Sequence, residues 1–228
     1  YSDLQGYATA GRTAEMQNRD RELSHYLMEN TGHDLVACLF QREDTLQEDA
    51  AAVLSLSVLD VTEAERMLRS LVNIAPAEEG VRKPRITFCY TANKAYPVYR
   101  LPQTTLFTQL TSFVEPSLHV FATFYGGRLL LAPDEDSLSR YIRQLDNDEV
   151  LDGALAYRAG TDGLSDSYHF MMMADFGHVL EQSGHQVHYV PEFFLRNSEF
   201  FRNFILFAQF TCADGMVYPN IVLKYKSE

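Results

Sequence analysis

Residues 118–145 carry the pattern that most restricts how this chain can fold. An alternating apolar stretch, LHVFATFY, runs into Gly126 and Gly127 and is followed at once by RLLLA. Paired glycines supply the positive φ angles of a two-residue turn, so the pattern predicts a β-hairpin in which Tyr125 pairs with Arg128. This register places six apolar side chains on one face of the hairpin: Leu118, Val120, Ala122, Phe124, Leu129 and Leu131.

A helix is predicted directly after this hairpin. Pro133 ends the strand, and Asp134 suits the N-terminus of a helix. Apolar residues then recur at the spacing of one helical face: Leu138, Tyr141, Ile142 and Leu145. We expect this helix to cover the apolar face of the hairpin, which gives a hairpin–helix unit.

The same unit is predicted a second time, earlier in the chain. A shift of 74 residues aligns two segments with five identities in sixteen positions, namely Leu56 with Leu130, Asp60 with Asp134, Arg66 with Arg140, Arg69 with Arg143 and Leu71 with Leu145. The apolar stripes agree as well, because Leu68 falls on Ile142. We therefore expect two superposable units in which Leu68 and Ile142 occupy equivalent buried sites.

The rest of the pattern extends this architecture to the whole chain. A surface helix is predicted over residues 13–30, and the pattern becomes rich in Asp and Gly after Gln144. We expect residues 1–228 to form one α+β domain of two subdomains, with the hairpin–helix repeats in 1–145 and an aromatic-rich part in 146–228. Antiparallel hairpins would form one or two sheets, with the amphipathic helices packed on one face.

Charge and hydropathy exclude two classes of partner. The chain has 19 Lys and Arg against 31 Asp and Glu, a net charge of −12, which argues against nucleic acid. No apolar run approaches the roughly 20 residues of a membrane-spanning helix, so no membrane insertion by this fragment is expected.

The sequence contains no convincing catalytic or cofactor-binding motif. Four histidines, His169, His178, His185 and His188, have poor spacing for zinc and no HExxH arrangement. The acidic run Asp146, Asp148, Asp152 and Gly153 lacks further ligands of a calcium loop, and residues 163–167 (GLSDS) fail the G-x-S-x-G pattern. Cys38, Cys89 and Cys212 each lie in an apolar strand-like segment, which predicts buried thiols. We therefore assign no catalytic residue, no metal ligand and no cofactor.

Aromatic residues gather in the last part of the chain. Of the 28 Phe and Tyr residues, 13 fall within the final 61 positions. A helix is predicted over residues 192–202, and its Phe193, Phe194, Phe200 and Phe201 cannot all share one stripe. They could pack on Phe204, Phe207 and Phe210 of the last hairpin, or form an exposed patch for a partner. We predict that at least one of the four rings is exposed and marks a contact surface.

Three segments carry a resemblance to a known family: YRLPQTTLFTQL, FYGGRLLLAPDEDSLSRYIRQL and the closing DGMVYPNIVLKYK. The chain resembles the amino-terminal domain of an uncharacterised envelope-protein family of Bacteroides-type bacteria, a domain of unknown function. The resemblance implies a periplasmic or cell-envelope location.

On this basis the expected function is a non-enzymatic interaction or scaffold domain of a larger envelope protein. Its partner would be another protein or the following domain of the same chain. A small-ligand or lipid carrier, or a metal-dependent hydrolase that uses the histidines, stays open as an alternative.

Overall fold

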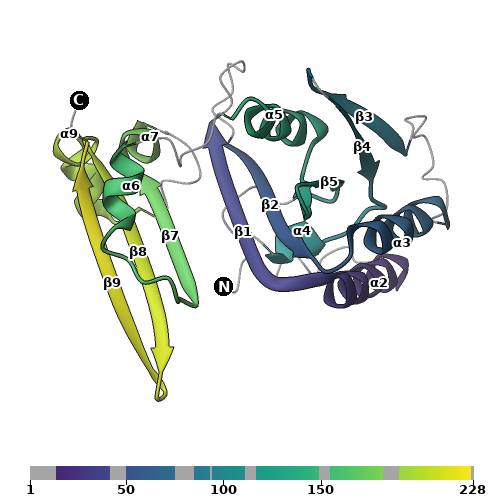
Figure 1. Cartoon of the computed structure of the whole chain (residues 1–228), viewed down its shortest axis with the longest axis horizontal. Coiled ribbons are helices and arrows are strands. Elements are labelled where there is room, and N and C mark those ends of the chain that lie inside the picture. The colour runs from purple at the N-terminus through teal and green to yellow at the C-terminus, as the bar shows by residue number, and fades with distance from the viewer. Residues whose placement is uncertain are drawn as a thin grey trace. The chain divides into compact units, whose positions relative to one another are not determined.

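The computed structural model describes residues 14–41, 50–74, 85–92, 94–110, 117–148, 155–181 and 190–226. The chain divides into two compact units (Figure 1). The amino-terminal unit comprises Tyr1–Phe40 and Ala50–Asp148, and the carboxyl-terminal unit comprises Gln41–Asp49 and Glu149–Glu228. The described strands form an antiparallel sheet of six strands in the first unit and of three in the second. The α+β class predicted from the hairpin pattern is therefore confirmed.

The amino-terminal unit alternates hairpins and helices along the chain. Its helices are α2 (Ala14–Asn30), α3 (Val61–Ile74), α4 (Leu106–Leu110) and α5 (Glu135–Asp146). Its strands are β1 (Thr31–Gln41), β2 (Ala50–Val58), β3 (Ile86–Tyr90), β4 (Ala95–Arg100), β5 (Phe121–Tyr125) and β6 (Arg128–Ala132). The sheet order is β1-β2-β6-β5-β4-β3, so β2 and β6 from the two predicted units are neighbouring inner strands.

The predicted register of the β5–β6 hairpin is confirmed. Tyr125 pairs with Arg128, and Phe124 pairs with Leu129. Gly126 and Gly127 have φ angles of 54° and 79°, which are unfavourable for residues with a side chain but not for glycine. The turn thus sets which residues of the hairpin share a face.

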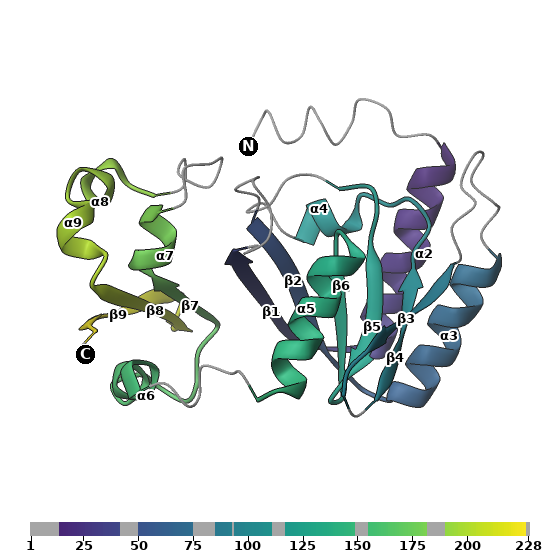
Figure 2. The same cartoon turned by 90° about the horizontal axis from the view of Figure 1, so that it is seen from above.

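Helices pack on both faces of this sheet, which corrects the expected one-face arrangement. Leu129 and Leu131 belong to a core shared with α2, α3 and α4, whereas Leu130 and Ala132 belong to a second core shared with α5. In Figure 2, α5 and the pair α2 and α3 accordingly lie on opposite sides of β5 and β6. The helix α5 therefore covers the face opposite to the predicted one, because β6 is a central strand that needs apolar residues on both sides.

The two hairpin–helix units are alike locally but do not superpose as wholes. Leu68 and Ile142 are both buried, at 1% and 0% exposure, as predicted. In each unit the helix also covers the face that carries the aligned strand residue, Leu56 or Leu130. However, a rotation that superposes the β1–β2 hairpin on β5–β6 would put both helices on one face. Since α3 and α5 lie on opposite faces, the prediction of superposable units is wrong.

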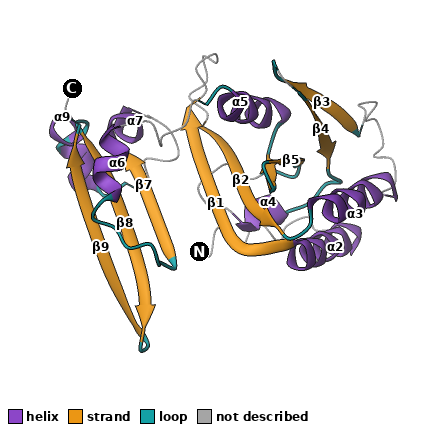
Figure 3. Cartoon of the chain, in the orientation of Figure 1, coloured by secondary structure: helices purple, strands orange, loops and turns teal. Residues whose placement is uncertain are grey.

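The carboxyl-terminal unit is smaller and more open. Its described helices are α6 (Leu155–Thr161), α7 (Phe176–Glu181), α8 (Glu192–Arg196) and α9 (Ser198–Phe201), and its strands are β7 (Phe170–Asp175), β8 (Phe204–Ala213) and β9 (Met216–Tyr225). The strands pair in the order β7-β8-β9. Figure 3 shows the long β8–β9 hairpin extending beyond the short helices. A turn at Asp214 and Gly215, both with positive φ, closes this hairpin.

Candidate interaction surface

The four phenylalanines named from the sequence lie on two short helices rather than on one. Asn197 separates α8 from α9, with φ −116° and ψ 32°, and its side-chain amide donates to the Phe193 carbonyl at 2.8 Å. The predicted single helix over 192–202 is therefore wrong. This break turns the chain, so that residues from both helices come together around one ring.

Phe201 is the centre of this cluster and is itself buried. Its ring centroid lies 4.8 Å from that of Phe194, 5.4 Å from Phe193 and 5.1 Å from Phe200. Phe176, at the start of α7, stacks on Phe194 at 4.9 Å and is also buried. Edge-to-face contacts of this kind are favourable for aromatic pairs, so the inner rings form the small core of this end of the unit.

Phe193 and Phe200 remain open to solvent, with 62% and 61% of their surface exposed. The exposure predicted for at least one ring is therefore found in two. The predicted packing on the last hairpin is also found, because the ring centroid of Phe200 lies 5.0 Å from that of Phe204 in β8. A role of these rings in contacting a partner stays a prediction.

The apolar surface continues from α9 onto the sheet. Phe204 contacts Tyr225 of β9 at 5.3 Å, and the two residues are cross-strand partners. The register places further side chains on this same face, and the exposed apolar ones are Phe170, Met172, Val217, Ile221, Leu223 and Tyr225. We call this set of six residues the open face.

The opposite face of the same sheet is covered by α6. Tyr157 of α6 lies 6.1 Å from Phe207, which is fully buried, and Gly160 approaches the same ring so closely that no side chain would fit. Gln209 is also buried and exchanges hydrogen bonds with the backbone of Ser165. The sheet is thus covered on this side around Phe207 and Gln209, while the open face keeps large apolar side chains in water.

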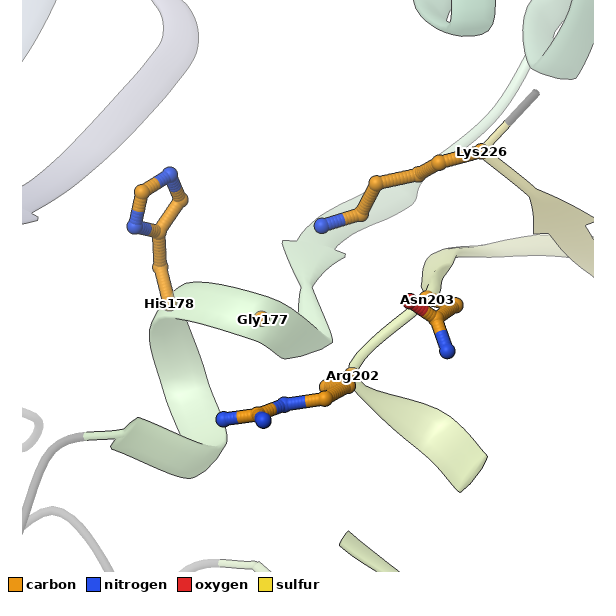
Figure 4. A pocket seen from close by; sticks show the side chains of 5 residues that line it. All are labelled: Gly177, His178, Arg202, Asn203 and Lys226. Atoms are coloured by element: carbon orange, nitrogen blue, oxygen red, sulfur yellow. The ribbon is translucent and has the colours of Figure 1, made fainter. Parts of the chain in front are cut away.

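A shallow pocket of about 280 Å³ adjoins the aromatic cluster (Figure 4). Its lining residues are Gly177, His178, Arg202, Asn203 and Lys226. Four of these five directly neighbour an aromatic residue of the cluster in the chain: Phe176, Phe201, Phe204 or Tyr225. Figure 4 shows the Lys226 side chain reaching toward Gly177. Its ammonium group donates to Asp175, which also accepts from the Gly177 N–H at 2.8 Å.

The histidines named from the sequence do not form a metal site in the described part of the chain. His169 accepts a hydrogen bond from the Cys212 N–H at 3.1 Å, and His178 lines the shallow pocket. His185 and His188 lie outside the described residues. Among the described residues there is no group of three or more His, Cys, Asp or Glu that could hold a metal ion.

Asp146, the first residue of the acidic run, has a contact within the amino-terminal unit. It accepts hydrogen bonds from Tyr96 and Tyr125 at 3.2 and 3.4 Å. Burial and this neighbouring carboxylate raise the pKa of both tyrosines. Asp152 and Gly153 lie outside the described residues.

The three cysteines differ in exposure. Cys89 is buried and Cys38 is half-buried, with its pKa raised by burial, which disfavours the reactive thiolate. Cys212 is exposed, so the prediction of a buried thiol is wrong there. The reason is that β7 pairs with β8 only up to Phe210, which leaves Cys212 on a two-stranded extension of the sheet.

A second pocket lies in the amino-terminal unit between α5 and the sheet. It has a volume of about 250 Å³, and Val36, Ser55, Tyr125, Gly126, Arg128, Leu130, Tyr141 and Leu145 line it. Arg128 donates to Ser55 and forms an ion pair with Asp34 at 2.8 Å. Ligand pockets usually measure about 300 to 1,000 Å³, so this groove does not favour the carrier alternative over protein contact.

Comparison of the chain with protein-family models, curated proteins and solved structures found no match. The resemblance to an envelope-protein family therefore stays a prediction. No described helix combines the length and the apolar character required to cross a membrane.

Proposed function

We propose that this chain is a non-enzymatic interaction or scaffold domain of a larger cell-envelope protein. The envelope location rests on the sequence resemblance alone. The observation that carries the interaction role is the set of exposed apolar side chains formed by Phe193, Phe200 and the open face, which ring contacts link through Phe201 and Phe204. Large apolar side chains gathered in one exposed patch are typical of protein contact surfaces.

The partner that fits this surface is a polypeptide segment with apolar side chains and a carboxylate at one end. Phe193 and Phe200 would supply rigid aromatic contacts, which are frequent among the residues that dominate binding energy. The adjoining pocket is lined by Arg202 and His178, and by Lys226, whose charge is already paired with Asp175, so Arg202 is the main basic group there. Basic groups beside an apolar surface favour an acidic flank on the partner over a basic one.

Binding of synthetic peptides to the full chain tests this proposal. One set has an apolar core flanked by aspartates, and a matched set has the same core flanked by lysines. Fluorescence anisotropy should show binding of the aspartate set, weakened at least about tenfold in the variant Phe193→Ser/Phe200→Ser, because both ring contacts are lost. Arg202→Glu should shift the preference toward the lysine set.

The matched control is Phe88→Ser/Tyr90→Ser, which removes two exposed rings from the amino-terminal unit and should leave binding unchanged. Thermal melts of each variant establish that it is folded. Failure of both peptide sets to bind, or binding that is indifferent to Phe193 and Phe200, would overturn the proposal. Binding of phospholipid vesicles in place of the peptides would also overturn it.

A further inference from the structure

The sheet of the amino-terminal unit has two edge strands, β1 and β3, of very different character. β1 spans eleven residues, and β3 spans only five. Among the described strands none pairs with the outer edge of β1. On β1, Leu35, Val36 and Leu39 are exposed at 43%, 51% and 43%, which is unusual because long apolar edges invite pairing with another strand.

The carboxyl-terminal unit shows how an edge of similar length can be protected. β9 is also an edge strand, but Pro219 lies near its middle and pairs across to Phe210. Hydrogen-bonded and non-hydrogen-bonded residue pairs alternate along the hairpin, beginning with the hydrogen-bonded pair Ala213–Met216 beside the turn. Phe210–Pro219 is therefore a non-hydrogen-bonded pair. The Pro219 nitrogen faces the outer edge, where it has no hydrogen to donate. β1 contains neither proline nor lysine, and its acidic residue, Asp34, forms an ion pair with Arg128.

The residues of β1 complement a second copy of themselves. Residues 35–39 read Leu-Val-Ala-Cys-Leu, which is nearly symmetric about Ala37. In an antiparallel pair centred on Ala37, Leu35 of each copy lies opposite Leu39 of the other. On the other face Val36 lies opposite Cys38. Apolar side chains would therefore meet apolar side chains at every one of these positions.

We propose that the chain forms a dimer in which β1 pairs antiparallel with β1 of a second copy, about a two-fold axis through Ala37. This pairing satisfies the outward backbone groups of both edges and joins two six-stranded sheets into one continuous sheet. The dimer uses a different surface and a different unit from the proposed partner contact, so either proposal can fail without the other.

Charge should make this dimer sensitive to salt. Each copy has a net charge of −12, so two copies repel each other at a distance, while the paired strands themselves are almost neutral. Added salt screens that repulsion but leaves backbone hydrogen bonds and apolar contacts largely intact. We expect sedimentation velocity to show a dimer whose dissociation constant falls as the salt concentration rises.

Lysines placed on β1 test the assignment of the edge. Leu35→Lys/Leu39→Lys puts a lysine opposite a lysine twice in the dimer, which should raise the dissociation constant at least about tenfold. Phe88→Lys/Tyr90→Lys is the matched control, because it places two lysines at exposed positions of the other edge strand, β3. This control should dimerise like the unchanged chain.

A disulfide tests the register and does not depend on charge. In a Cys38→Ala/Cys212→Ser background, Ala37→Cys should crosslink two copies under mild oxidation, since the two-fold axis brings these positions within disulfide range. Leu35→Cys in the same background is the control. The register separates its two copies by roughly 13 Å along the strands, too far for a disulfide.

A dimer that is lost in the β1 lysine variant and trapped through position 37 would support the proposal. A chain that stays monomeric, a dimer that persists with lysines on β1, or crosslinking that is equal at positions 35 and 37 would each overturn it. A monomer that binds an unrelated extended peptide along β1 would also overturn it, because the occupant would then be a partner and not a second copy.

Discussion

In the amino-terminal unit four consecutive residues of β6, from Leu129 to Ala132, are all buried, whereas six consecutive residues of β9, from Met216 to Ile221, are all exposed. Both strands are mainly apolar. β6 lies between β2 and β5 with helices on both faces, while β9 has one neighbouring strand. Apolar residues thus stabilise the fold in the first unit. In the second, many of them remain available for contacts outside the described chain.

The largest effect that tests this contrast should come from truncating a core side chain. Leu68→Ala and Ile142→Ala should each lower the free energy of unfolding by about 2 to 5 kcal/mol, because each leaves a cavity in a filled core. Ile221→Ala on the open face should change it by less than about 0.5 kcal/mol. Chemical denaturation measures all three values. Losses below about 0.5 kcal/mol at both core positions would place these helices on the surface.

A smaller effect should mark the sealed face of the carboxyl-terminal unit. A Cβ at Gly160 would lie 2.1 Å from Cε2 of Phe207. Gly160→Ala should therefore lower the free energy of unfolding by about 1 to 3 kcal/mol through overpacking, and with it the melting temperature. Gly163→Ala is the matched control, since the nearest atom to its Cβ, Cγ2 of Val222, is 3.9 Å away. Equal melting temperatures for the two variants would show that α6 does not seal this face.

The helix caps compare the two hairpin–helix units directly. Asp134 accepts from the Ser137 N–H at 2.8 Å, and Asp60 accepts from the Thr62 N–H at 2.9 Å. Asp60→Ala and Asp134→Ala should therefore each cost about 1 kcal/mol in denaturant unfolding. Asp136→Ala serves as control, because its exposed ion pair with Arg140 contributes less. Clearly unequal losses of unfolding free energy in the two variants would show that the two helix N-termini are not equivalent.

The smallest effect should be a pH dependence at the β1 edge. Hydrogen bonds from Ser57 and Arg128 hold the pKa of Asp34 below its ordinary value of 3.8. Its contribution to stability is therefore present above pH 3.8 and is lost as the pH falls through the lower folded-state pKa. Melting temperatures of the unchanged chain and of Asp34→Asn should differ near neutral pH and converge in acid. A difference that is constant with pH would show that the carboxylate has no such role.

Short-range features of the fold could be predicted because their causes lie within a few residues. The Gly126-Gly127 turn brings Tyr125 opposite Arg128, as predicted. Asp134 caps the N-terminus of α5, where the sequence also predicted a helix start. The candidate surface was partly predictable for the same reason. Adjacent rings on a short helix cannot all point inward, and Phe193 and Phe200 do not.

Other features depended on segments far away in the chain. The alternating pattern around Leu130 suggested one buried face, and only the positions of α3 and α5 made both faces buried. The length of β7 decided that Cys212 would be exposed.

The sequence alone was therefore enough for the β5–β6 turn, the register of that hairpin and the capped start of α5, since turn geometry and capping act over a few residues. Leu68 and Ile142 could be predicted as buried, but only the tertiary structure showed which face of the sheet each helix covers and which apolar residues of β9 stay exposed. Burial depends on which face of a sheet is covered. α3 and α5 each follow their strand directly, yet they pack on opposite faces of the sheet and bury Leu56 and Leu130 respectively, while α6, far away in the chain, covers Phe207. Leu35, Val36 and Leu39 of β1 and the six residues of the open face remain exposed.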